Sequence, residues 1–209
     1  MRFSLRYVLL ILVITNICGS VFAQPSVVER PRLVVGIMVD GMQQKHLDLL
    51  WSYFDPHGFK KIVGQGTNLR NVSYNVVSAG NASDVATVMT GSVPYYHGVA
   101  GEKYYSRAND KVQSIIADDQ QIGIGTKETV SAHNLLSSTI LDELMLAYPD
   151  KSKCYAVAID AEEAIMMGGH TAKSVAWIDD EQQKWVTTGY YTDGLSRWAD
   201  EMNVNGTFK

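Results

Sequence analysis

The feature that most limits how this chain can fold is an unbroken apolar run, Leu33-Val34-Val35-Gly36-Ile37-Met38-Val39, which ends at Asp40-Gly41. A strand with one face in water alternates apolar and polar residues, so a continuous run indicates a strand buried on both faces, as in a parallel sheet. The chemistry of α/β proteins gathers at the carboxyl ends of such strands. We therefore expect an α/β fold in which Asp40 ends the first strand at a functional edge.

Strand-like and helix-like patterns alternate along the rest of the chain, which favours a layered, mostly parallel sheet flanked by helices. Ser131 is predicted to cap the clearest helix, and the polar segment 105–128 is predicted to be a surface loop with a short strand around Ile115-Ile116. The expected strands are 72–77, 154–159, 174–178 and 185–191, and the expected helices are 43–54, 82–90, 131–147 and 194–202.

The first 23 residues have the pattern of a secretory signal peptide. Arg2 and Arg6 precede an apolar run over residues 8–14, and Val21-Phe22-Ala23 is a typical cleavage site. The run is too short to span a bilayer, and the residues before Cys18 make a poor lipoprotein signal. We predict cleavage after Ala23, secretion or export to the periplasm, and a mature α/β domain over residues 24–209 without a transmembrane segment.

Composition narrows the possible partners. The chain carries 22 acidic and 18 basic residues, a net charge of −4, and no basic stripe, so nucleic acid is not expected as a partner. Only Cys154 remains after signal cleavage, so no internal disulfide can form. Its apolar surroundings predict a core residue.

Three motifs together resemble the alkaline phosphatase superfamily, most of all its secreted phosphate monoesterases and its type I phosphodiesterase/nucleotide pyrophosphatase branch. They are Val39-Asp40, the segment Thr90-Gly91-Ser92-Val93-Pro94 with His97-Gly98 and Ala100-Gly101 after it, and Ala164-Ile165 with Gly169-His170-Thr171-Ala172. The resemblance runs from about residue 30 to residue 203.

The resemblance implies a chemistry and a domain size. In that superfamily a divalent metal pair, zinc, binds a Thr or Ser hydroxyl that attacks phosphorus, while an Asn, a Lys and an Arg hold the phosphate. The other metal ligands come from the second half of the domain. The resemblance therefore predicts that this chain is the N-terminal part of a longer domain.

Carried over position by position, the resemblance leaves one functional residue in place. Asp40 matches the metal ligand that ends the first strand. The nucleophile position, nine residues before Thr90, falls on Asn81. The phosphate-binding positions are all acidic: Glu102, Asp160 and Glu162. We predict that none of these four substituted positions is catalytic or binds substrate, and that a metal, if bound, involves Asp40.

The substituted residues have the wrong chemistry for phosphoryl transfer. A nucleophile must lose a proton, attack and later leave, which a metal-bound hydroxyl does and the amide of Asn81 cannot do. Asn81 is instead predicted to be a helix N-cap, with Asp84 at the third helical position. Two like charges about 4 Å apart at an effective dielectric constant of about 20 repel by roughly 4 kcal/mol, so the acidic positions should reject a phosphate dianion.

Other readings of the same residues stay open at this point. A slip of register by one or two residues would offer Ser83 or Ser78 as a hidden nucleophile. The acids near Asp40 could bind Ca²⁺ or Mg²⁺ or flank a glycosidic bond, although most such acids simply face solvent. His97 and His170 are predicted to fix loops by hydrogen bonding rather than to bind metal.

Three hypotheses about function follow. In the first, this is a secreted, catalytically degenerate member of the phosphatase/phosphodiesterase superfamily with a ligand that the sequence does not identify. In the second, it is an active metal-dependent phosphoric-ester hydrolase that uses another nucleophile or a metal-bound water. In the third, the chain is a gene fragment that cannot fold alone because a truncated sheet exposes an apolar edge.

Overall fold

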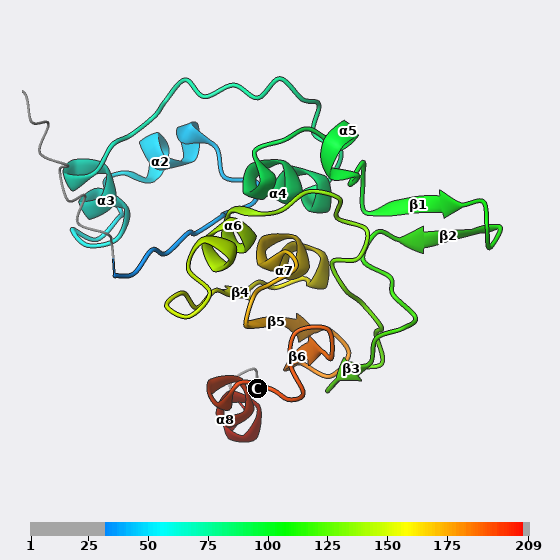
Figure 1. Ribbon diagram of the computed structural model, residues 1–209. Helices are drawn as coiled ribbons and strands as arrows, with labels where there is room; N and C mark the ends of the chain where they lie inside the picture. The colour runs from blue at the N-terminus through cyan, green and yellow to red at the C-terminus, as the bar shows by residue number, and fades with distance from the viewer. Residues whose placement is uncertain (1–31, 207–209) are drawn as a thin grey trace, which may run out of the picture. The chain divides into compact units, whose positions relative to one another are not determined.

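The structure is a computed structural model that describes residues 32–206 (Figure 1). The predicted signal peptide, residues 1–23, lies outside the described residues. The chain divides into two compact units, residues 1–42 and 43–209, and each is described by itself.

In the first unit, the apolar run 33–39 forms no strand. Its side chains are exposed, from 78% for Leu33 down to 40% for Met38. Asp40 follows in a turn, where its Oδ1 accepts a hydrogen bond of 2.7 Å from the backbone N–H of Gly41. The prediction of a buried first strand is therefore wrong for the described residues. Apolar composition favours burial, but a strand exists only where a neighbouring backbone pairs with it.

The second unit contains a four-stranded sheet in the order β3-β6-β5-β4. The strands are β3 (Gly123–Ile124), β4 (Tyr155–Val157), β5 (Ser174–Asp179) and β6 (Lys184–Thr188). The α/β class is confirmed, but the expected mostly parallel pairing needs correction: β4 pairs parallel with β5, while β6 pairs antiparallel with β5 and with β3. The short turn between β5 and β6 can join only antiparallel neighbours, whereas helix α7 (Ala161–Gly168) supplies the crossover that parallel β4 and β5 require.

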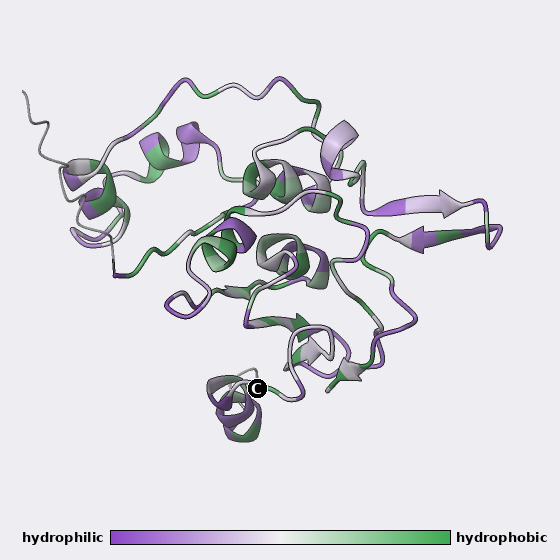
Figure 2. Ribbon diagram, in the orientation of Figure 1, coloured by the Kyte–Doolittle hydropathy of each residue, from purple (hydrophilic) through white to green (hydrophobic). Residues whose placement is uncertain are grey.

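Helices pack on this sheet and form a small core with it. Helix α7 packs on β4 and β5, α4 (Asn81–Thr90) packs on α7, and α6 (Ile140–Ala147) contacts both helices. Figure 2 shows hydrophobic residues along α7 and the strands that it covers. The fully buried members of this core include Ala82, Ala86, Ala164, Ile165, Met166, Val175 and Val186.

The remaining elements depart more from expectation. The expected strand 72–77 does not form. A hairpin of β1 (Lys103–Ser106) and β2 (Lys111–Ser114) overlaps the start of the predicted loop 105–128. Most side chains of this hairpin are exposed, so it lacks the alternation of apolar and polar residues that reveals a half-buried strand. Ile115 and Ile116, directly after the hairpin, are buried but do not form the predicted short strand.

The predicted helix 131–147 is shorter than expected. Ser131 does not cap it, because its hydroxyl donates to Asp118 in the neighbouring loop. The helix starts at Ile140, where the Thr139 side chain accepts a hydrogen bond from the backbone of Asp142. The apolar spacing alone did not reveal the turns at residues 132–138.

The other helices are α2 (Gln44–Leu50), α3 (Phe59–Gln65), α5 (Pro94–His97) and α8 (Arg197–Asn205). Helix α2 lies within the predicted helix 43–54, and α8 overlaps the predicted helix 194–202. Among residues 32–206, no helix is both long enough and apolar enough to cross a membrane.

Candidate functional site

The site begins at the start of helix α4. Gly80 is the N-cap with φ +105°, a conformation that L-residues rarely adopt, and Asn81 is the first helical residue. The predicted N-cap role of Asn81 is therefore wrong by one position, because only glycine adopts the required backbone without strain. A Cβ on Gly80 would lie 3.3 Å from Oε1 of Glu102, so that carboxylate lies directly against the helix start.

The Asn81 side chain reaches across to helix α7. Its Nδ2 donates a hydrogen bond of 3.0 Å to Oε1 of Glu163, and both residues are half-buried. Glu163 was not among the site residues predicted from the sequence. One available signal was its place in the first turn of a helix, where acidic residues interact favourably with the helix dipole. The residue at the nucleophile position is thus bonded to a carboxylate.

The structure brings two of the other predicted positions close to this pair and leaves a third at the helix end. Glu162 accepts a hydrogen bond of 3.4 Å from the Ser114 hydroxyl, and Ser114 pairs in the hairpin with Lys103, the neighbour of Glu102. Glu102 and Glu162 therefore lie at the same end of the hairpin. Asp160 is the exposed N-cap of α7, and its side chain makes no cap hydrogen bond.

Acidic side chains near Glu162 influence one another. Burial raises the pKa of Glu128, and the charges of Glu162 and Asp179 raise that pKa further. Asp40 belongs to the other unit of the chain and is exposed. Its predicted role as a metal ligand stays a prediction.

Residues 32–206 do not by themselves form a complete metal centre. Among residues 32–206, no three His, Cys, Asp or Glu side chains come together in a group that could hold a metal ion. At the position of the expected metal-bound hydroxyl, Asn81 presents an N–H donor to Glu163.

Of the two alternative serines, Ser83 lacks the surroundings of a nucleophile. Ser83 is 1% exposed, and its hydroxyl has no hydrogen-bond partner, so no base activates it. Ser78 donates a short hydrogen bond to Asp84 in the first turn of α4. That bond fixes the chain where it enters the helix.

The predicted loop-fixing role of His97 is confirmed. His97 is fully buried, its Nδ1 accepts a hydrogen bond of 3.1 Å from the backbone N–H of Val99, and its Nε2 lies 3.1 Å from the hydroxyl of Thr87. Because the Thr87 hydroxyl already donates to a backbone carbonyl, Nε2 is the protonated nitrogen of a neutral ring. Burial lowers the pKa of His97, which keeps the ring neutral.

Asp142, which was not predicted to have a role, joins the start of α6 to the loop after α7. Its Oδ2 accepts from the backbone and hydroxyl of Thr139, and its Oδ1 accepts from the backbones of His170 and Thr171 and from the hydroxyl of Thr171. Burial alone would raise the pKa of Asp142, but these hydrogen bonds outweigh it and lower the pKa. The Thr-x-x-Asp spacing of a capping box was the available signal.

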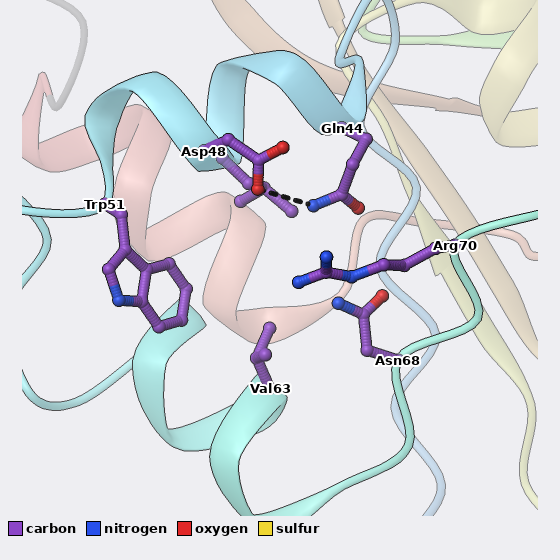
Figure 3. A pocket seen from close by; sticks show the side chains of 7 residues that line it. Gln44, Asp48, Trp51, Val63, Asn68 and Arg70 are labelled. Atoms are coloured by element: carbon purple, nitrogen blue, oxygen red, sulfur yellow. Dashed lines mark hydrogen bonds between the residues drawn. The ribbon is translucent and has the colours of Figure 1, made fainter.

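A cavity of about 270 Å³ lies elsewhere, between α2, α3 and residues 68–70 (Figure 3). The Arg70 and Asn68 side chains point into it, and Gln44 donates a hydrogen bond of 3.2 Å to Asp48 on its wall. None of the predicted site residues lines this cavity.

Comparisons with known proteins agree with the family resemblance of the sequence motifs. Residues 34–209 match the sequence profile of the family described as type I phosphodiesterase / nucleotide pyrophosphatase. The chain is 33% identical over 202 residues to the alkaline phosphatase PafA of Elizabethkingia meningoseptica, a match that covers 95% of this chain and 37% of PafA. It is 30% identical over 188 residues to the alkaline phosphatase PhoV of Synechococcus elongatus, covering 88% of this chain and 34% of PhoV.

The solved structure of PafA matches this chain with a TM-score of 0.81 at 34% identity, over 85% of this chain and 35% of PafA. A second PafA structure, with the same TM-score, carries substitutions of a threonine to serine and of an asparagine, a lysine and an arginine to alanine. The threonine and asparagine lie 21 positions apart, and the lysine and arginine lie two positions apart. The chain thus spans about a third of the length of the relatives that it matches.

Proposed function

Because the chain belongs to the type I phosphodiesterase/nucleotide pyrophosphatase family, we propose that it is an exported member of this family that has lost phosphoryl-transfer chemistry while keeping the fold around the former site. The proposal covers the N-terminal part of the family domain, residues 24–209, and includes cleavage of the signal peptide after Ala23.

One observation carries the proposal: Asn81 donates a hydrogen bond to the Glu163 carboxylate at the position where the family places its nucleophile. An amide nitrogen is neither basic nor able to leave after attack on phosphorus. The neighbouring carboxylate fills space that a phosphoryl group would need, and its negative charge repels that group. The asparagine at position 81 therefore provides no nucleophile, and the Glu163 carboxylate beside it disfavours a phosphorylated substrate.

The spacing of the substituted residues supports this assignment. Asn81 and Glu102 are 21 positions apart, like the threonine and asparagine replaced in the PafA variant. Asp160 and Glu162 are two positions apart, like the replaced lysine and arginine. If these positions correspond, a hydroxyl has become an amide and three groups that attract phosphate have become carboxylates.

Such exchanges change the sign of the local charge. A Lys and an Arg attract a phosphate dianion, and Arg does so with two parallel hydrogen bonds. Asp160 and Glu162 repel the same dianion, and Glu162 already raises the pKa of Glu128 through its charge. We therefore expect this region to disfavour phosphate and other anions.

The test is a hydrolysis assay with a chromogenic phosphate monoester and a diester, in the presence of zinc. We expect turnover by the full-length natural protein to equal that of its Asp40→Ala variant, with PafA as the positive control in the same buffer. Metal-dependent turnover well above the Asp40→Ala variant would contradict the proposal and favour the alternative of an active phosphoric-ester hydrolase with another nucleophile.

A further inference from the structure

We propose that the hydrogen bond between Asn81 and Glu163 is an internal lock, in which the Glu163 carboxylate joins the starts of helices α4 and α7 and takes the place of an external anion. The inference deepens the proposed function at the same site and rests on it for the meaning of the lock. Its test measures folding stability and anion binding, not turnover, so the two can fail separately.

The geometry of the two helices makes Glu163 suitable for this role. Asn81 is the first residue of α4 and Glu163 is the third residue of α7, and Nδ2 and Oε1 are 3.0 Å apart. Their neighbours Ala82 and Ala164 are fully buried. Alanine side chains allow the two helices to approach closely, so the hydrogen bond lies at the rim of a packed helix–helix contact.

Electrostatics favour a carboxylate at this place. The first turn of a helix carries unpaired backbone N–H groups and the positive end of the helix dipole, which together attract negative charge. Glu163 lies in the first turn of its own helix and reaches the first residue of α4. One side chain therefore places its charge near two helix starts, and the hydrogen bond from Asn81 orients it.

The lock also gives Asn81 a function that a threonine would perform less well. A threonine hydroxyl is shorter than the asparagine side chain, and it can donate only one hydrogen bond. The amide extends further and keeps a second N–H and an oxygen for other contacts. On this view the exchange at position 81 removed a reactive hydroxyl and created a longer donor that can span the gap between α4 and α7.

A double-mutant cycle tests the stabilising part of the proposal. The variants are Asn81→Ala, Glu163→Ala and the combination, each made in the full chain and unfolded in urea at neutral pH. Since the acceptor is charged and half-buried, we expect the pair to couple by about tenfold in the folding equilibrium constant. Glu163→Gln keeps an acceptor but removes the charge, so it should lose only part of that coupling. A cycle with no coupling would overturn the lock.

A second measurement tests whether Glu163 keeps anions out. The matched pair is Glu102→Gln/Glu162→Gln and the same protein with Glu163→Gln added, so the two differ only in the charge of Glu163. Inorganic phosphate, compared with sodium chloride of equal ionic strength, should raise the melting temperature of the triple variant and leave the double variant unchanged. An equal response of both variants, or a response of neither, would contradict the role of Glu163 as an internal anion.

Discussion

Replacing Asp142 by asparagine tests whether the junction between α6 and the loop after α7 depends on a charged carboxylate. Asp142 is 2% exposed and accepts five hydrogen bonds, on both of its oxygens. Asparagine has nearly the same shape but keeps one carbonyl oxygen and presents an NH₂ group on the other side. That NH₂ would face the donors of Thr139 or those of His170 and Thr171.

The expected loss of stability follows from these contacts. Two or three hydrogen bonds to a charged acceptor disappear, each worth about 1.5–3 kcal/mol, and they do not add fully. We therefore expect Asp142→Asn to lower the free energy of unfolding by roughly 3–5 kcal/mol at pH 7. For a domain of about this size, that corresponds to a fall of roughly 10 °C in melting temperature.

The pH dependence gives a second signature. Because the folded-state pKa of Asp142 lies below its ordinary value of 3.8, the stability from this group is present at neutral pH and disappears as the pH falls below about 3.8. The difference between wild type and Asp142→Asn should therefore shrink in acid. Urea unfolding followed by circular dichroism at pH 7 and pH 3 measures both values.

The exposed Asp150 provides a matched control, because Asp150→Asn makes the same chemical change outside the junction. We expect it to alter the free energy of unfolding by less than about 0.5 kcal/mol. If Asp142→Asn behaved like Asp150→Asn at pH 7, the inferred network at Asp142 would be wrong.

Three further perturbations follow from single contacts. Burial places the folded-state pKa of His97 below its ordinary value of 6.5, so wild-type stability should fall as the pH drops below 6.5, and His97→Asn should flatten that slope in urea titrations. Gly123→Ala should lower the free energy of unfolding by about 2–3 kcal/mol, because its Cβ would lie 2.4 Å from the carbonyl oxygen of Thr126. The control Gly194→Ala adds a Cβ with no atom nearby, so it should leave the melting temperature almost unchanged. Burial raises the pKa of Cys154, so its alkylation by iodoacetamide should be slow in buffer and fast in urea. Mass spectrometry measures both rates, and equal rates would contradict the core position of Cys154.

The local periodicity of the sequence was enough to predict much of the second unit. Strands were expected at 154–159, 174–178 and 185–191, and the structure has β4, β5 and β6 within or overlapping these segments. The helix after residue 80 was also expected, with its end at Gly91. These elements are encoded by residues close together in the chain, namely apolar spacing, caps and glycines, so a linear reading detects them.

The same reading failed where an element depends on a distant partner. The run 33–39 has strand-like residues but forms no strand, and the hairpin 103–114 forms one without apolar alternation. Strand pairing is decided by backbone hydrogen bonds between segments, and composition reports them only indirectly.

At the candidate site the sequence alone determined the family resemblance and the identity of the substituted residues, because each of these is a property of single positions and their spacing. Only the tertiary structure decided what those residues do. Glu163 is 82 positions from Asn81. The residues around each of them do not indicate that the two side chains meet. Their hydrogen bond exists because α4 and α7 pack against each other, and a contact created by packing becomes visible only when the chain is folded.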